Sequence, residues 1–214
     1  MAKDTVDISI EALKQFLHGP LPGREAQDLM APSTRSTENR MADPADARPS
    51  SVLVLFYQRE GQWFIPFIQR PVYDGVHSGQ VSFPGGKCEE EDEGHLYTAL
   101  RETREEIGVI PGEVIPLGAL TPLYIPNSNF FVYPHVGWMD KTPAFVPDPL
   151  EVEEVIEVTV DRLLDKRYTK TFCREVNEIT ITAPYFDAGS KKIWGATAMM
   201  LSEMLEILKM LERG

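Results

Sequence analysis

Cysteine is nearly absent from this sequence of 214 residues: only Cys88 and Cys173 occur, too few for a disulfide framework. No charged and then apolar leader opens the chain. The longest uninterrupted apolar run, residues 52–57, is far shorter than the roughly 20 residues that cross a bilayer. We therefore expect a cytoplasmic protein with no segment embedded in a membrane.

Positive charge is also scarce in the sequence. Lys and Arg total 21 against 33 Asp and Glu, so the formal net charge at pH 7 is −12. Such a charge repels nucleic acids and anionic membrane surfaces, and we expect neither as a partner. It also repels an anionic small substrate, unless a bound cation inverts the local field.

The rest of the composition is that of a globular protein. Hydrophobic residues make up 43% and charged residues 25%, which excludes wholly disordered, collagen-like and coiled-coil chains. Residues 8–17 predict a short helix that ends at Gly19 and Pro20, and residues 20–50 predict a long connection with one helical turn at 25–30. We expect residues 1–50 to form this N-terminal helix and connection, and residues 51–214 to form the main domain.

The main domain mixes strands and helices. The apolar run at residues 51–57 predicts a central strand buried on both faces, paired in a hairpin with residues 63–69. Further strands are expected at residues 114–123, 130–138, 155–160, 176–181 and 192–194, and helices at residues 95–107 and 196–212. Because regular βαβ alternation is missing, the pattern predicts an α/β sandwich around a mixed β-sheet. The apolar stripe of the C-terminal helix predicts core packing or a homodimer face, for which the N-terminal helix is a second candidate.

Three glutamates on the helix expected at residues 95–107 carry the clearest chemical signal. Glu102, Glu105 and Glu106 stand at i, i+3 and i+4, so their carboxylates leave one helical face within one turn. Their mutual repulsion, and the helix dipole in this C-terminal half, both destabilise the helix. A bound cation offsets both costs, and carboxylate oxygens favour Mg²⁺ or Mn²⁺. A solvated acidic face is the alternative for the glutamates taken alone.

The neighbouring residues make this pattern more specific. Gly85 and Gly86 follow Pro84 in a sharp turn before the helix, and Gly108 lies where a helix ends with positive φ. Arg101 directly precedes the first glutamate. At ordinary residue frequencies, Gly86, Arg101, the three glutamates and Gly108 coincide by chance with a probability of about 10⁻⁵ over the chain.

This stretch resembles the box of the Nudix hydrolase family, G-x5-E-x7-R-E-U-x-E-E-x-G-U, where U is apolar. Residues 101–109 match its second half, except that Thr103 stands at an apolar position. The first half is one residue longer than the box, so either Asp92 or Glu93 takes its acidic position. The resemblance implies a Nudix-type α/β/α sandwich and an enzyme that hydrolyses a nucleoside diphosphate linked to another moiety.

The resemblance also implies roles for individual residues. The metal ligands for Mg²⁺ or Mn²⁺ would be Glu102, Glu105, Glu106 and the Gly86 carbonyl, and Arg101 would orient a glutamate through a salt bridge. Bound metal would offset the substrate's charge, activate a water and stabilise an in-line displacement at phosphorus.

The general base is left open between the box and a later segment. Glu105 and Glu106 are the candidates within the box. Glu151 and Glu154 lie in residues 149–155, which resemble a later family loop that often supplies an acidic residue. A charge at a strand edge is the alternative for these two, and the geometry of the site must decide.

A second motif lies directly upstream of the box. Residues 70–86 resemble the signature of the coenzyme A pyrophosphatase branch, L-L-T-x-R-[SA]-x3-R-x3-G-x3-F-P-G-G, with Arg70, Gly79 and residues 83–86 in the right spacing. Gly75 replaces the second arginine, Pro71 takes the Ser/Ala position, and residues 66–68 replace L-L-T. The expected substrate-binding residues are Arg70, His77, Gly85 and Gly86, with Arg70 as a phosphate ligand.

A polar and aromatic loop follows one of the expected strands. It contains Asn127, Asn129, Phe130 and Phe131, and it either holds a base or an acyl tail or forms a turn anchored by two core phenylalanines.

The leading hypothesis for function is a Mg²⁺-dependent Nudix pyrophosphatase. It would convert coenzyme A or its derivatives into 3′,5′-ADP and phosphopantetheine. The alternatives are a pyrophosphatase for ADP-ribose, NADH or another nucleoside diphosphate derivative, and a sensor that binds a nucleotide without hydrolysing it. The complete set of box acids speaks against the sensor, since a pure binder has no need of them.

Overall fold

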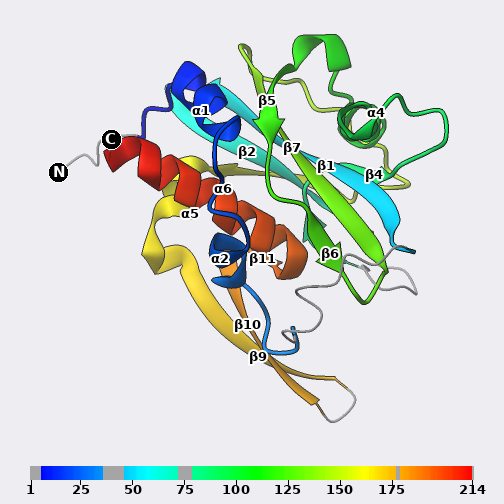
Figure 1. Cartoon of the computed structure of the whole chain (residues 1–214), viewed down its shortest axis with the longest axis vertical. Helices are drawn as coiled ribbons and strands as arrows, with labels where there is room; N and C mark the ends of the chain where they lie inside the picture. Colours follow the sequence, from blue (N-terminus) through cyan, green and yellow to red (C-terminus); the bar gives the residue numbers. More distant parts are fainter. Residues whose placement is uncertain (1–5, 36–45, 72–78, 177–178, 214) are drawn as a thin grey trace.

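The computed structural model describes residues 6–35, 46–71, 79–176 and 179–213. Helices cover both faces of a central sheet (Figure 1). The strands are β1 (Arg48–Arg59), β2 (Gln62–Gln69), β3 (Val81–Ser82), β4 (Gly85–Lys87), β5 (Ile115–Ala119), β6 (Leu123–Ile125), β7 (Phe130–Met139), β8 (Glu154–Thr159), β9 (Thr169–Val176), β10 (Ile179–Ala188) and β11 (Lys191–Trp194). The helices are α1 (Ile10–Leu17), α2 (Gly23–Asp28), α4 (His95–Ile107), α5 (Val160–Leu164) and α6 (Gly195–Arg213), with 3-10 turns η1 (Pro111–Glu113) and η2 (Lys166–Tyr168).

Eight strands form one mixed sheet whose main path runs β3-β2-β1-β7-β5. β1 pairs with β7 in parallel and with β2 and β4 in antiparallel orientation. β6 adds to β7, and β8 adds to β2. The expected central position of residues 51–57, and their hairpin with residues 63–69, are confirmed.

The side chains on the two faces of β1 pack into two separate parts of the core. Leu53 and Leu55 belong to a buried cluster that includes Ile107 of α4, whereas Val54 and Phe56 belong to the cluster that contains the residues of α1 and α6. Successive side chains of a strand point to opposite faces, so both faces of this strand are apolar. The α/β/α sandwich is therefore confirmed, with α4 on one side of the sheet and α1 and α6 on the other (Figure 1).

The apolar stripe of α6 packs into the core. Met204, Leu205 and Leu208 are buried within this chain. The core-packing interpretation of this stripe is therefore confirmed, while the homodimer stays a prediction. Among the described helices, none is both long enough and apolar enough to span a bilayer.

A second sheet of three antiparallel strands, in the order β11-β10-β9, lies beside α6. The strand expected at residues 176–181 is wrong, because β9 ends at Val176 and β10 begins at Ile179. β9 carries exposed polar side chains at Thr171, Arg174 and Glu175, so it lacks the apolar pattern by which strands are recognised.

The N-terminal segment is fastened to α6 by a buried carboxylate. Glu203 is fully buried and accepts hydrogen bonds from Gly23 N (3.1 Å), Gln27 Nε2 (2.9 Å) and Thr121 Oγ1 (2.7 Å). One side chain thus joins α2, α6 and the loop before β6. The helices expected at residues 8–17 and 25–30 correspond to α1 and α2, while the domain boundary at residue 50 stays a prediction.

Candidate active site

The glycine turn brings the backbone of β4 against both β1 and α4. Gly85 has a φ of 148°, and a side chain there would overlap the backbone of Ser51 and Val52. A side chain at Gly86 would overlap the carboxylate of Glu102 on α4. The two glycines therefore allow the close approach that sets β4 beside the acidic turn.

Arg101 is the centre of an ion-pair network on α4. Its Nε and Nη2 donate to Asp92 Oδ1 (2.9 Å) and Oδ2 (3.0 Å). Its Nη1 donates to Glu102 Oε1 (3.0 Å) and Glu105 Oε2 (2.9 Å). The guanidinium is expected to orient these carboxylates, because it contacts all three at once.

The partner of Arg101 settles the acidic position that the longer loop left open. The side chain of Asp92 is only 3% exposed and also accepts hydrogen bonds from Thr98 Oγ1 (2.7 Å) and the Glu89 N–H (3.0 Å). The hydrogen bonds from Arg101 hold the pKa of Asp92 well below its usual range. Glu93 is exposed, so Asp92 rather than Glu93 occupies the position.

Glu106 is the most deeply buried acid of the box, with a relative exposure of 1%. Its Oε2 accepts the Gly85 N–H (2.8 Å), and its Oε1 lies 3.3 Å from Arg70 Nη2. Burial raises the pKa of Glu106 to about 8, although Arg70 and the Gly85 N–H oppose the shift. Arg70 Nη2 also donates to the Gly85 carbonyl (3.0 Å), so Arg70 contacts both the glycine turn and the buried glutamate of the box.

The three glutamates share one turn, as predicted, but their carboxylates do not converge on one point. The Glu102 side chain is 15% exposed and that of Glu105 is 53% exposed. In the described part of the chain, no three His, Cys, Asp or Glu side chains are arranged to hold a metal ion. The donor chemistry still fits a hard cation, since burial raises the pKa of both Glu102 and Glu106 and a bound cation would compensate their charge.

The segment after β7 covers the C-terminal end of α4 and brings Glu151 near the box. Val146 N donates to the Ile107 carbonyl and Asp148 N to the Glu106 carbonyl, each at 3.0 Å, which satisfies two of the last helical acceptors. Glu151 is exposed, and its charge contributes to the raised pKa of Glu106. The other candidate base, Glu154, pairs instead with Lys191 (3.0 Å).

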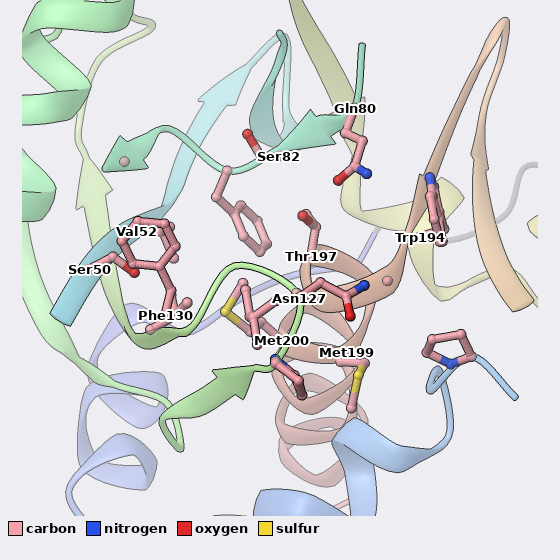
Figure 2. A pocket seen from close by; sticks show the side chains of 18 of the residues that line it. Ser50, Val52, Gln80, Ser82, Asn127, Phe130, Trp194, Thr197, Met199 and Met200 are labelled. Atoms are coloured by element: carbon pink, nitrogen blue, oxygen red, sulfur yellow. The ribbon is translucent and has the colours of Figure 1, made fainter. Parts of the chain in front are cut away.

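A cavity of about 460 Å³ opens beside β4 and α6 (Figure 2). This volume lies within the range of small-molecule sites. Its described lining contains three cationic residues and no carboxylate, unlike the strongly acidic chain as a whole; the cations are Arg35, Arg70 and Lys87. The apolar part includes Val52, Phe83, Ile125, Phe130, Trp194, Met199 and Met200.

The expected substrate-binding residues are only partly placed by the structure. Arg70, Gly85 and Gly86 line the cavity, whereas His77 and Gly75 lie outside the described residues. Of the polar and aromatic loop, Asn127 and Phe130 line the cavity, and the others do not.

The sequence interpretation missed the walls of the cavity that lie far from the box. Met199 and Met200 are buried in the core, as the packing interpretation expected, but they also line the cavity, and so does Arg35 from the N-terminal connection. No local pattern marks them, because they meet the box only through the tertiary fold.

Known proteins share the box region of this chain. The NUDIX domain family model matches residues 47–174. Human mitochondrial coenzyme A diphosphatase NUDT8 is 38% identical over 138 residues, which cover 63% of this chain and 58% of that protein. Nudix hydrolase 15, mitochondrial, of Arabidopsis thaliana is 33% identical over 160 residues, or 72% and 56% of the two chains. Peroxisomal coenzyme A diphosphatase NUDT7 of Mus musculus is 37% identical over 114 residues, or 53% and 48%.

This chain thus spans between 48% and 58% of the length of these three relatives. Residues 1–46 and 175–214 lie outside the family match, although they build part of the cavity wall. The match covers more than half of the chain and includes the glycine turn, the buried acids and Arg101. The chain belongs to the NUDIX domain family.

Proposed function

We propose that this protein is a metal-dependent pyrophosphatase that hydrolyses the diphosphate of coenzyme A or a derivative to 3′,5′-ADP and the corresponding phosphopantetheine. The main support is the position of Arg70, which contacts the buried Glu106 and also lines a cavity large enough for a ligand. The charged residues in the described lining of this cavity are all cationic. The names of the human and mouse relatives support coenzyme A as the substrate. The cytoplasmic location and the absence of nucleic-acid partners stay predictions.

The acidic turn would hold the metal. Glu102, Glu105 and Glu106 would be its ligands, with the Gly86 carbonyl beside them. When bound, Mg²⁺ or Mn²⁺ supplies Lewis acidity and a more acidic water. Arg101 fixes Glu102 and Glu105 through hydrogen bonds to both carboxylates.

The protein's own residues divide the remaining tasks. Arg70 lies where the box meets the cavity, and its guanidinium would bind a phosphoryl oxygen there. Glu151 is the proposed general base, because Glu106 is buried against the Gly85 N–H and Glu105 is paired with Arg101, whereas Glu151 is exposed. The proposed catalytic set thus comprises Glu105 and Glu106 as metal ligands, Glu151 as the base, and Arg101, which positions Glu105.

A substrate panel tests this function. With Mg²⁺ present, we expect the wild type to release 3′,5′-ADP from coenzyme A faster than it cleaves ADP-ribose or NADH, and we expect EDTA to abolish the reaction. Product analysis by liquid chromatography measures both. Turnover of ADP-ribose with coenzyme A left intact would overturn the choice of substrate. Binding without turnover on every diphosphate would instead favour a nucleotide sensor.

The two adjacent glycines provide a matched pair of variants. Gly85→Ala places a methyl group against backbone and should destabilise the fold by about 3 kcal/mol or more. Gly86→Ala meets only the flexible end of Glu102, so its cost should be less than about 1 kcal/mol, while turnover falls because that carboxylate is displaced. Thermal melts and initial rates measure the two effects. Equal melting temperatures for the two variants would contradict the prediction that only the Gly85 methyl group clashes with backbone.

A further inference from the structure

The cavity has a second region, to which the family match (residues 47–174) and the first turns of α6 both contribute. Met199 and Met200 come from the first turns of α6, and Phe130 begins β7 across from them. Figure 2 shows the labelled side chains of Asn127, Thr197 and Met199, all three of which line this cavity. This region, which we call the methionine subsite, consists of Asn127, Phe130, Met199 and Met200.

Asn127 is the polar group of the methionine subsite. Its side chain is exposed at the cavity and makes no hydrogen bond to the described part of the protein. Asn129, two residues later, has a different role: it adopts a φ of 52° and bonds to Tyr124 Oη (3.0 Å) and the Asp46 carbonyl (3.1 Å). The loop is thus held by Asn129, which leaves the Asn127 amide available to a ligand as both donor and acceptor.

The surrounding side chains suit a flexible chain better than a planar base. Met199 and Met200 offer thioethers that adapt to irregular shapes. One face of the Phe130 ring is covered by the Arg48 guanidinium at 4.3 Å, and Trp194 packs edge-on against Phe172. In the described structure, none of the contacting ring pairs has both of its rings in the cavity lining.

We propose that the methionine subsite binds the non-nucleotide arm of the substrate, an apolar chain that carries amide groups, and that Asn127 is the specificity-determining residue for this arm. The proposal rests on the proposed diphosphatase function, since coenzyme A supplies such an arm and ADP-ribose does not. Asn127 would pair with an arm amide while Phe130, Met199 and Met200 contact the methylene groups.

The test compares Asn127→Ala with the wild type on coenzyme A and ADP-ribose. We expect the ratio of kcat/KM for coenzyme A to that for ADP-ribose to fall about tenfold, mainly through KM, because one hydrogen bond to the arm is lost. Asn129→Gly is the matched control: glycine accepts the positive φ, so a general disturbance of the loop should change both substrates alike.

Calorimetry provides a readout that does not need turnover. Asn127→Ala should weaken coenzyme A binding about tenfold and leave the affinity for 3′,5′-ADP, which lacks the arm, unchanged. Equal weakening for both ligands would show that the residue recognises the nucleotide and would overturn the proposal, as would no weakening for either. If the wild type binds coenzyme A but hydrolyses none of the diphosphates, the proposed function fails. The effect of Asn127→Ala on the affinity for coenzyme A would still test whether the methionine subsite binds the arm. Failure of the wild type to bind coenzyme A overturns the arm proposal.

Discussion

Glu106→Gln is expected to lower kcat/KM on coenzyme A by about 10³-fold while the protein stays folded. The variant keeps the shape of the side chain and an oxygen that can accept the Gly85 N–H. It removes the buried negative charge that is proposed to bind the metal. Initial rates at saturating Mg²⁺ measure the loss, and turnover close to that of the wild type would refute the metal assignment.

The stability of Glu106→Gln separates a catalytic role from a structural one. Burial raises the pKa of Glu106 to about 8, so the folded protein holds this proton more tightly than the unfolded chain, whose value is near 4.5. The contribution to stability is complete below pH 4.5 and is lost as the pH rises through 8. Without divalent metal, the variant should therefore melt at or above the wild-type temperature at pH 8. A markedly lower melting temperature would assign Glu106 a structural role.

Metal addition completes this comparison. A metal that binds only the folded state at 100 times its Kd stabilises the protein by about 2.7 kcal/mol, or roughly 5–10 °C in a chain of this size. We expect Mg²⁺ or Mn²⁺ to raise the melting temperature of the wild type and to have much less effect on Glu106→Gln. Equal shifts in the two proteins would place the metal elsewhere.

Asp92→Asn should show the largest loss of stability among conservative changes in the box. Asp92 receives two hydrogen bonds from Arg101 and its side chain is buried, so the change leaves a partly buried guanidinium short of one partner. Breaking such a pair costs about 3 kcal/mol, which corresponds to a melting temperature lower by roughly 6–12 °C. Turnover should also fall about tenfold or more, because Arg101 positions Glu102 and Glu105.

The neighbouring acid serves as the control for Asp92. Glu93→Gln alters an exposed side chain next in sequence and should change stability by less than about 0.5 kcal/mol. The pKa of Asp92 is depressed, so its stabilising effect is present above the unfolded value and is lost as the pH falls through the folded one. The stability difference between wild type and Asp92→Asn should therefore shrink in strong acid. A constant difference down to low pH would contradict the ion-pair explanation.

Local patterns predicted the helix and the spacing of its acids correctly. The 3.6-residue period of α4 and the glycine at its end depend on neighbours in sequence; Gly108 indeed has a φ of 74°. Whether Asp92 or Glu93 pairs with Arg101 depends on the path of the loop before α4. The burial of Glu106 depends on the close approach of β4. The periodicity of the sequence encodes neither feature.

The cavity could not be predicted from local sequence patterns, for a different reason. Its walls come from the segment before β1, the loop after β6 and the first turns of α6, which only the tertiary fold brings together. The polar strand β9 was missed because its exposed side chains carry no alternating apolar signal. Methionines at helical spacing look the same in a core and in a ligand site, so their role needed the structure.

The bridge formed by Glu203 has a consequence for biosynthesis. Gly23 and Gln27 are translated long before Glu203, their carboxylate acceptor on α6. These hydrogen bonds can therefore form only after almost 180 further residues have been translated. The cavity can acquire its final shape only after α6 has been synthesised. Nascent chains stalled before residue 203 should therefore remain inactive and sensitive to proteases.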